Sequence, residues 1–245
     1  MVNGIYTGRN GMMLLQEMVD NTTNNLANAT TTGFKKSLMS SIAEVNNKRN
    51  NENLLYHDES HWMADNRIDF EQGSLVDTGN PMDVAIEGKG FFQVETPDGV
   101  RYSRTGSLTR NGMGEVTTLQ GFKVLDSSGS PIQAEGAAFS VSSNGNVQVD
   151  GQSVGKIAVV NFENPQELQR VGQNSYKLPE GSEQVALPSE DFTLRQGYIE
   201  ASNVNVVESM VELIRFQRNY EMDQKAVQSE DETLQKAVNE IGRIG

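Results

Sequence analysis

The sequence lacks cysteine, long apolar runs and an N-terminal secretory signal. Its 245 residues include no Cys, which excludes a disulfide framework and a thiolate zinc site. No window holds the roughly 18 consecutive apolar residues that a membrane-spanning helix requires, so membrane insertion is not expected. Residues 1–16 contain Arg9 but no apolar stretch that ends in a small-residue cleavage site, so a cleaved signal is not expected either.

Positive charge is also scarce. The chain has 33 Asp and Glu against 20 Lys and Arg, a net charge of -13 and a pI near 4.6. Because affinity for nucleic acid depends mainly on clustered Lys and Arg, a nucleic-acid partner is not expected. The length suffices for one sizeable domain with extensions, or for two small domains, without disulfide or metal staples.

Proline and glycine are concentrated in the middle of the chain. All six Pro lie between Pro81 and Pro188, and most Gly lie in the same region. Pairs such as Asn111-Gly112 and Asp150-Gly151 are typical of tight turns. Several short stretches between these turns alternate apolar and other residues. We therefore predict an inserted all-β domain of short antiparallel strands over residues 67–200.

The C-terminal end, residues 201–245, has the periodicity of a long helix. Apolar residues recur every seven positions at Val206, Leu213, Tyr220, Val227, Leu234 and Ile241. A partner row, Met210, Gln217, Gln224, Asp231 and Val238, is polar in its middle. Either these polar positions fix the register between helices, or the helix turns its buried face toward Ile214, Met222 and Ala226.

The N-terminal end, residues 1–36, has a matching but shorter pattern. Ile5, Met12, Val19 and Leu26 are seven apart, with Leu15 on the alternating row beside Gly8 and Thr22. Threonines at 30–32 and Gly33 then end the helix. We predict that this helix pairs with residues 203–245 as a coiled-coil assembly domain, which makes the fold mixed α and β.

The middle domain is too small to cover the whole length of the longer helix. About 36 helical residues span roughly 54 Å, whereas a domain of about 120 residues has a radius of gyration near 14 Å. Part of the apolar seam is therefore expected to pack against neighbouring subunits; the alternative is a helical hairpin within one chain. The predicted assembly interface comprises Ile5, Met12, Val19, Asn24, Asn25, Leu26, Asn28, Val206, Met210, Leu213, Gln217, Tyr220, Val227 and Leu234.

Polar residues near these helices leave two interpretations open. Asn24, Asn25 and Asn28 either cap their own helix or bind exposed backbone groups and neighbouring chains. Arg215 and Arg218 either pair with carboxylates across a subunit interface or lie on a solvated helix face.

Residues 37–66 are interpreted as a connector. Their Asn content, at positions 46, 47, 50, 51 and 53, predicts mobility in the free monomer. His57 and His61 have the four-residue spacing of a helical metal site, but their Asn-rich flanks and the missing glutamate argue against one. With two His and no Cys, few residues could act as nucleophiles or metal ligands. We expect no enzymatic activity, metal or cofactor.

Several motifs resemble those of the flagellar rod and hook protein family. Residues 24–28 (NNLAN) and 32–35 (TGFK) are similar to its N-terminal signature. Residues 78–92 (TGNPMDVAIEGKGFF) and 102–106 (YSRTG) resemble the start of its β domain, and residues 197–204 (GYIEASNV) and 213–220 (LIRFQRNY) its C-terminal signature. These motifs span nearly the whole chain and occur in the family's order.

This resemblance implies a structural protein without a cofactor. Members of the family are exported unfolded from the cytoplasm through the flagellar type III export apparatus, without a cleaved signal, and assemble with copies of themselves and with other rod and hook proteins. The implied location is the periplasmic rod of the flagellar basal body. The length and the connector favour an F-type proximal rod protein over a G-type distal one. The alternatives from other classes are a secreted adhesin-like β module and a cell-wall glycan hydrolase.

Overall fold

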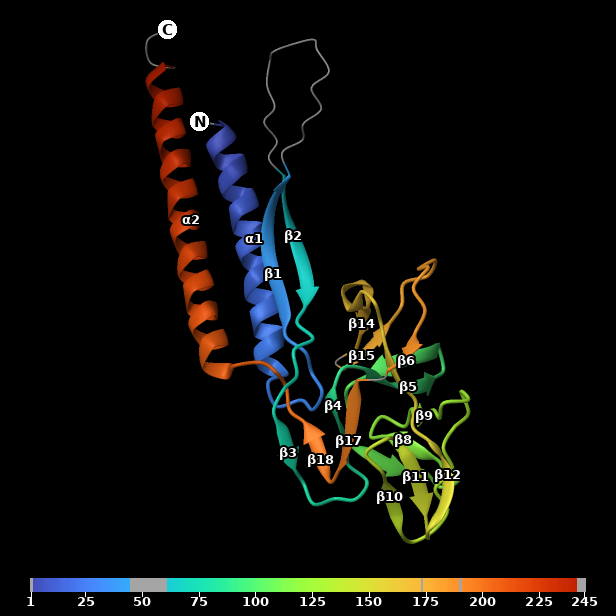
Figure 1. Ribbon diagram of the computed structural model, residues 1–245. Helices are drawn as coiled ribbons and strands as arrows, with labels where there is room; N and C mark the ends of the chain where they lie inside the picture. The colour runs from blue at the N-terminus through green and yellow to red at the C-terminus, as the bar shows by residue number, and fades with distance from the viewer. Residues whose placement is uncertain (1, 45–60, 173, 190, 242–245) are drawn as a thin grey trace. The chain divides into compact units, whose positions relative to one another are not determined.

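The computed structural model describes residues 2–44, 61–172, 174–189 and 191–241. The chain divides into two compact units. The helical unit comprises residues 1–27, 37–67 and 205–245, and the β unit comprises residues 28–36 and 68–204. Two terminal helices with antiparallel strands between them confirm the predicted mixed α and β fold (Figure 1).

The helical unit contains both helices and one pair of strands. Helix α1 (Val2–Ala27) and helix α2 (Val206–Ile241) run side by side in opposite directions (Figure 1). Helix α2 begins at a typical N-cap, because Asn205 Oδ1 accepts hydrogen bonds from the backbone N–H groups of Val207 and Glu208, at 3.1 and 3.3 Å. The heptad pattern therefore predicts both helices correctly.

The two ends of the expected connector form a strand pair that the sequence analysis does not predict. Strands β1 (Ser37–Glu44) and β2 (His61–Ile68) form a two-stranded sheet. Residues 37–44 read SLMSSIAE, without the regular alternation that marks a strand. The Asn-rich stretch, with Asn46, Asn47, Asn50, Asn51 and Asn53, lies outside the described residues, as do His57, Asp58 and Glu59.

In the described part of the β unit, the chain forms sixteen short strands. A nine-stranded sheet has a main path β14-β15-β6-β5-β9-β8-β7, with β13 joined to β5 and β16 joined to β13. A three-stranded sheet, β10-β11-β12, and the pairs β17-β4 and β18-β3 complete the unit. The bounds are β3 Leu75–Asp77, β4 Val84–Gly88, β5 Phe91–Thr96, β6 Gly99–Ser103, β7 Leu108–Arg110, β8 Val116–Thr118, β9 Lys123–Val124, β10 Phe139–Val141, β11 Asn146–Val149, β12 Gln152–Lys156, β13 Val159–Asn161, β14 Gln169–Val171, β15 Ser175–Lys177, β16 Leu187–Pro188, β17 Phe192–Gln196 and β18 Tyr198–Glu200.

The predicted turns occur between these strands. In the β11–β12 hairpin, Asp150 and Gly151 have φ values of 51° and 80°, as a type I′ turn requires. The paired strands of the β unit are antiparallel, for example β17 with β4 and β5 with β6. Sequence therefore predicts the strand type and the hairpins of this unit.

Two buried clusters form the core of the β unit. The larger one contains aliphatic residues and Phe from strands β4 to β17, including Val84, Ile86 and Phe92. The smaller one is aromatic and includes Phe91, Tyr102 and Tyr176. Tyr176 lies edge-on to Phe91 and Phe70, at centroid distances of 5.8 and 5.4 Å.

Candidate functional site

The two terminal helices contact each other along one face of each. Leu213, Tyr220, Val227 and Leu234, predicted to line the seam of α2, are all half-buried. The row that alternates with them in the structure contains Phe216 and Asp223, which are also half-buried. Val206, Met210 and Gln217 are exposed and thus lie outside this seam, as do Gln224 and Asp231. The polar residues in the middle of the partner row, Gln217, Gln224 and Asp231, therefore face solvent in the single chain.

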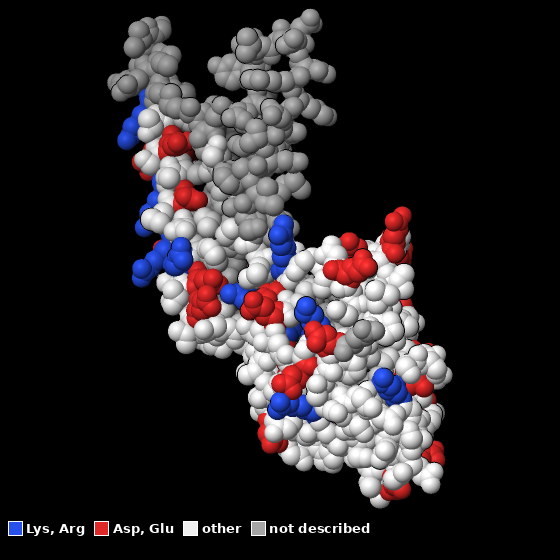
Figure 2. All heavy atoms as spheres, in the orientation of Figure 1, with Lys and Arg blue, Asp and Glu red and all other residues white. Residues whose placement is uncertain are grey.

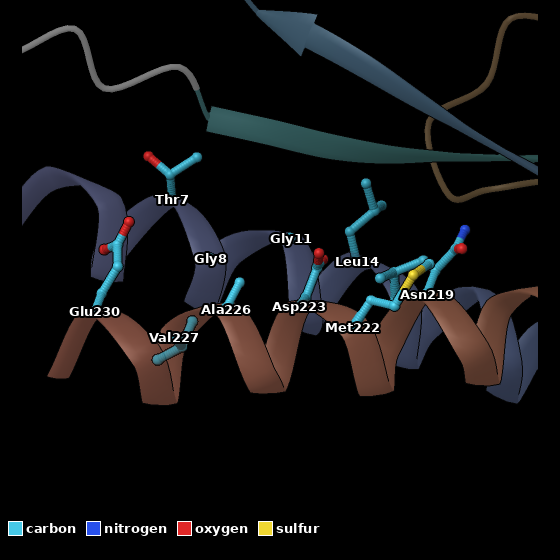
Figure 3. Close-up of a pocket in the computed structure, with 11 residues that line it drawn as sticks. Thr7, Gly8, Gly11, Leu14, Asn219, Met222, Asp223, Ala226, Val227 and Glu230 are labelled. Carbon is cyan, nitrogen blue, oxygen red and sulfur yellow. The ribbon is translucent and has the colours of Figure 1, made fainter. Parts of the chain in front are cut away.

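On α1, Gly8 and Gly11 lie against α2. A Cβ on Gly8 would lie 2.5 Å from Val227 Cγ2, and one on Gly11 would lie 3.3 Å from Asp223 Oδ2. Figure 3 shows Gly8 and Gly11 facing these residues beside an open groove of about 510 Å³ between the helices. Small residues thus allow the two backbones to approach closely here.

The remaining predicted residues of α1 have different environments. Met12, Val19 and Leu26 are half-buried, whereas the side chain of Ile5 lies outside the described part of the chain. Leu15 and the buried Thr22 continue the row of Gly8. Met12, Val19 and Leu26 thus lie on the same side of α1 as the row of Gly8, Leu15 and Thr22.

Asn25 connects the end of α1 to strand β1. Its side-chain amide donates to the Ser37 carbonyl at 2.8 Å, and its Oδ1 accepts from the Ser37 N–H at 2.8 Å. These two hydrogen bonds satisfy the backbone N–H and carbonyl of Ser37, the first residue of β1. Asn28 accepts a hydrogen bond from the Thr31 hydroxyl at 3.2 Å, while Asn24 is exposed. Asn25 thus binds exposed backbone of its own chain, which is one of the roles that the sequence left open.

Three charged side chains form a buried ion cluster inside the β unit. We define this cluster as Lys35, Arg104 and Glu200. Lys35 Nζ lies 2.5 Å from Glu200 Oε1, and Arg104 Nη1 lies 3.3 Å from Glu200 Oε2. All three side chains are at most 5% exposed. The sequence analysis did not predict this cluster, because isolated Lys, Arg and Glu usually indicate surface positions.

Backbone groups complete the coordination of the cluster. Lys35 also donates to the Glu71 carbonyl at 2.6 Å, and Arg104 donates to the Gly88 carbonyl at 2.8 Å. Glu200 Oε1 accepts the N–H of Gly73 at 3.0 Å. The Glu200 carboxylate therefore neutralises one of two neighbouring cations and accepts hydrogen bonds on both oxygens.

Burial dominates the electrostatics of this cluster. It lowers the pKa of the Lys35 ammonium below the ordinary value, and the nearby Glu200 carboxylate offsets part of this effect. It likewise lowers the pKa of the Arg104 guanidinium, again partly offset by Glu200. Glu200 therefore opposes the effect of burial on both cations.

Two glycines allow the segments around the cluster to touch. Gly33 has a φ of 69° and donates its N–H to the Glu200 carbonyl at 2.8 Å. A Cβ at Gly33 would lie 2.7 Å from the Arg104 carbonyl carbon, and one at Gly106 would lie 1.8 Å from the Val84 carbonyl oxygen. The TGFK, YSRTG and GYIEASNV motifs therefore meet at one place within the β unit.

A buried tyrosine next to this region gives a pH-dependent prediction. Tyr176 is 0% exposed, and its hydroxyl has no hydrogen-bond partner among the residues that the structure describes. Desolvation raises its pKa to about 12, with Arg170 opposing the increase. Because an unfolded tyrosine ionises near pH 10, its contribution to stability is complete below pH 10 and is lost toward pH 12, at roughly 1.4 kcal/mol per pH unit.

We therefore expect Tyr176→Phe to unfold less readily than the wild type between pH 10 and 12, and to match it within about 1 kcal/mol at pH 7. Urea unfolding followed by circular dichroism at several pH values measures this difference. Tyr198→Phe, at a partly exposed tyrosine, is the control. Parallel alkaline profiles for Tyr176→Phe and wild type would contradict the prediction.

The described residues also show whether the ligand groups that a metal site requires come together. Within them, no group of three or more His, Asp or Glu side chains is arranged to hold a metal ion. The spacing of His57 and His61 is not tested, because His57 lies outside that part of the chain. No helix in the described ranges is long and apolar enough to cross a membrane.

Comparisons with known proteins identify the family. The family model "Flagella basal body rod protein" matches residues 5–35, "Flagellar hook protein FlgE/F/G D1 domain" matches residues 85–149, and "Flagellar basal body rod FlgEFG protein C-terminal" matches residues 195–240. Lys35, Arg104 and Glu200 each fall within one of these three ranges.

Full-length relatives agree with these matches. The chain is 36% identical to the flagellar basal-body rod protein FlgG of Borreliella burgdorferi, over 98% of each chain. It is 32% identical to the rod protein FlgF of Caulobacter vibrioides, over 100% of each, and 31% identical to FlgG of Bacillus subtilis. With its terminal helices, its inserted β unit and these similarities over its full length, the chain belongs to the flagellar basal-body rod protein family.

Proposed function

We propose that this protein is a structural subunit of the bacterial flagellar rod that polymerises through its two terminal helices. The observation that carries the proposal is the exposed apolar surface of α2. Val207, Val211 and Ile214 are 71, 54 and 50% exposed. Such a row of exposed apolar side chains marks an interaction surface. A helix gains most of its stability from packing, which neighbouring subunits would supply.

The unequal lengths of the helices support the same conclusion. Helix α2 has 36 residues and α1 has 26, so α2 is longer by roughly 15 Å. One α1 therefore cannot cover the whole length of α2. The predicted interface residues that lie outside the seam within one chain, Val206, Met210 and Gln217, are available to neighbours.

The proposed partners are copies of this chain and other rod and hook proteins. We further propose that the chain crosses the inner membrane through the flagellar export apparatus without a cleaved signal and is assembled in the periplasmic part of the basal body. In this role the β unit is a structural element, and the protein needs no enzymatic activity, cofactor, nucleic acid or membrane insertion.

Within the family we favour the F-type proximal position, with the G-type distal position as the alternative. The F-type relative from Caulobacter vibrioides aligns over 248 residues and covers 100% of both chains. The G-type relative from Borreliella burgdorferi is more identical, at 36%, but aligns over 262 residues, so this alignment contains more gaps. The agreement in length therefore supports the F type, and the identity supports the G type.

An in-frame deletion of the gene tests the proposed function. We expect loss of motility and basal bodies with a missing or short rod in electron micrographs. Full-length protein should restore both, whereas a chain without residues 206–245 should restore neither. A rod that stops at its base would indicate the proximal position, and a rod that lacks only its outer part the distal one. Motile cells with intact rods would contradict the proposal.

A further inference from the structure

Residues 32–36, which we call the entry segment, bind to the last residues of the β unit. The Gly33 N–H donates to the Glu200 carbonyl at 2.8 Å, and the Lys36 N–H donates to Asn203 Oδ1 at 2.6 Å. These hydrogen bonds use backbone donors near both ends of the entry segment. The beginning of the β unit is therefore bound directly to its end.

Residues 197–204, which we call the exit segment, close this end of the β unit. Strand β18 within it pairs with β3, and the Ala201 N–H donates to the Ser74 carbonyl at 2.8 Å. The Glu200 carboxylate accepts the Gly73 N–H at 3.0 Å. Without the exit segment, both the entry segment and the chain around β3 would lose backbone hydrogen-bond partners.

The exit segment also supplies the counter-charge for two buried cations. Among the described residues, Glu200 is the only carboxylate that forms an ion pair with Lys35 or Arg104. Burial lowers the pKa of the Lys35 ammonium, Glu200 offsets this effect most, and Asp69 offsets it less. Before Glu200 is in place, docking of the entry segment would therefore bury cations without their ion-pair partner, which is strongly unfavourable.

The chain must close a long loop to bring this carboxylate into place. Lys35 and Glu200 are 165 positions apart, and closing so long a loop costs chain entropy and slows folding. During synthesis at about 5–20 residues per second, Glu200 is added roughly 8–33 s after Lys35. Throughout this interval the β unit lacks the carboxylate that its two buried cations need.

We infer that the buried ion cluster delays folding of the β unit until the exit segment docks. The cations lose their water before the ion pairs are complete, so the transition state of folding contains poorly paired charges that an apolar cluster would not have. The consequence for export rests on the proposed function, because a chain that passes through the export apparatus unfolded must not fold beforehand. The delay therefore keeps the chain unfolded for longer before export.

Refolding of the purified full-length chain tests this delay. The triple variant Lys35→Met, Arg104→Met and Glu200→Leu has no charge to desolvate at the cluster. After dilution from urea, pulsed amide exchange should show strands β4 to β6 of this variant becoming protected at least about tenfold faster than those of the wild type. A triple variant that refolds at the wild-type rate, or more slowly, would overturn the inference.

An exposed ion pair provides the matched control. Glu87 and Arg195 are paired at 2.6 Å, their side chains are more than 40% exposed, and 108 positions separate them. Figure 2 shows acidic and basic side chains on one face of the β unit, where water solvates them. Glu87→Leu with Arg195→Met removes charges that stay in water, so its refolding rate should remain within about twofold of the wild-type rate. An equal acceleration in this control would show that burial of charge is not the cause and would overturn the inference.

The wild type provides a further test that needs no substitution. If the cluster sets the folding rate, the amides of the entry segment and those of β5 and β6 should become protected in one common slow phase, because neither region is stable before Glu200 docks. Pulsed exchange of the wild-type chain measures both regions in one experiment. Protection of β5 and β6 in an earlier phase than the entry segment would mean that the core folds without the cluster, which contradicts the inference.

Export provides the test in cells. In the deletion strain, a larger share of the pulse-labelled triple variant than of the wild type should stay in the cytoplasm in a protease-resistant form. Val94 is 1% exposed in the core of the β unit, so Val94→Ala weakens that core. Adding Val94→Ala to the triple variant should restore export if early folding is the cause. A triple variant that refolds faster but is exported as quickly as the wild type would refute the role of the cluster in export.

The outcomes separate the inference from the proposed function. Refolding is measured on purified protein without a flagellum, so a wild-type refolding rate in the triple variant would overturn the inference and leave the proposed function intact. Intact rods in the deletion strain would instead remove the proposed function, and with it the consequence for export. The refolding rates would then still decide whether the cluster delays folding.

Discussion

Replacing Glu200 by leucine is expected to lower the free energy of unfolding of the protein by about 3–5 kcal/mol. The substitution leaves the cations Lys35 and Arg104 buried without the carboxylate with which both form ion pairs. Both cations lie within 3.3 Å of Glu200, and water does not reach them because their side chains are 1 and 5% exposed. Urea unfolding of the full chain, with amide exchange measured in strands β4 to β6, would report the loss where it arises.

A matched control separates burial from ion pairing as such. Glu87 pairs with Arg195 at 2.6 Å, but both side chains are more than 40% exposed. Glu87→Leu should therefore cost at most about 1 kcal/mol. If Glu200→Leu cost no more than Glu87→Leu, the buried ion cluster would not contribute to the stability of the β unit as described.

A compensated variant tests the cause of the effect. Lys35→Met, Arg104→Met and Glu200→Leu in one chain remove the whole cluster, so no uncompensated charge stays buried. Replacing a complete buried ion cluster with apolar residues is often neutral. We therefore expect the triple variant to recover most of the stability that Glu200→Leu loses. A triple variant less stable than Glu200→Leu would show that hydrogen bonds to the backbone matter more than charge.

The buried ion cluster brings together residues from three motifs that are far apart in the sequence. Lys35 lies in the segment that follows α1. Arg104 directly follows β6, and Glu200 is the last residue of β18. The β unit is therefore complete only with residues 28–36 from the N-terminal side and residues up to 204 from the C-terminal side. The ion cluster therefore joins residues 28–36, by which the chain enters the β unit, to the segment around Glu200, by which it leaves.

The sequence predicts the regular elements of this protein well. A seven-residue apolar repeat depends only on helix geometry, so both terminal helices follow directly from it. The Asp150-Gly151 turn follows in the same way, because positive φ values at both positions favour these residue types. The all-β character of the middle of the chain is a consequence of many such turns.

The contacts made by polar and small residues could not be predicted in the same way. Lys35 and Glu200 are 165 positions apart, and nothing in their local sequence shows that they meet. Strand β1 depends on the hydrogen bonds between Asn25 and Ser37, which are contacts between separate segments. The role of Gly8 could not be predicted either. Glycine has a low helix propensity, and the sequence does not show that this position lies against Val227 of the other helix.

Gly8→Leu is expected to disrupt the pairing of α1 with α2 and thereby rod assembly. Even the first atom of the new side chain would lie 2.5 Å from Val227 Cγ2, and three further carbons would follow in the same direction. We expect loss of the cooperative helical transition in thermal unfolding at 222 nm, together with loss of motility. Gln16→Leu, which places the same side chain at an exposed position of α1, should leave both unchanged.

Gly8→Ala tests whether helix propensity or packing has the larger effect on the stability of the helical unit, because the two effects have opposite signs. Alanine raises helix propensity over glycine by about 1 kcal/mol, so propensity alone predicts a more stable helical unit. Overpacking against Val227 predicts a loss of about 1–3 kcal/mol. We expect the loss, and we expect Val227→Ala to relieve it in the double variant, since Val227→Ala removes the Cγ2 atom that the new Cβ would meet. Stabilisation by Gly8→Ala alone would mean that α1 and α2 do not approach as closely in solution as the contact at Gly8 requires.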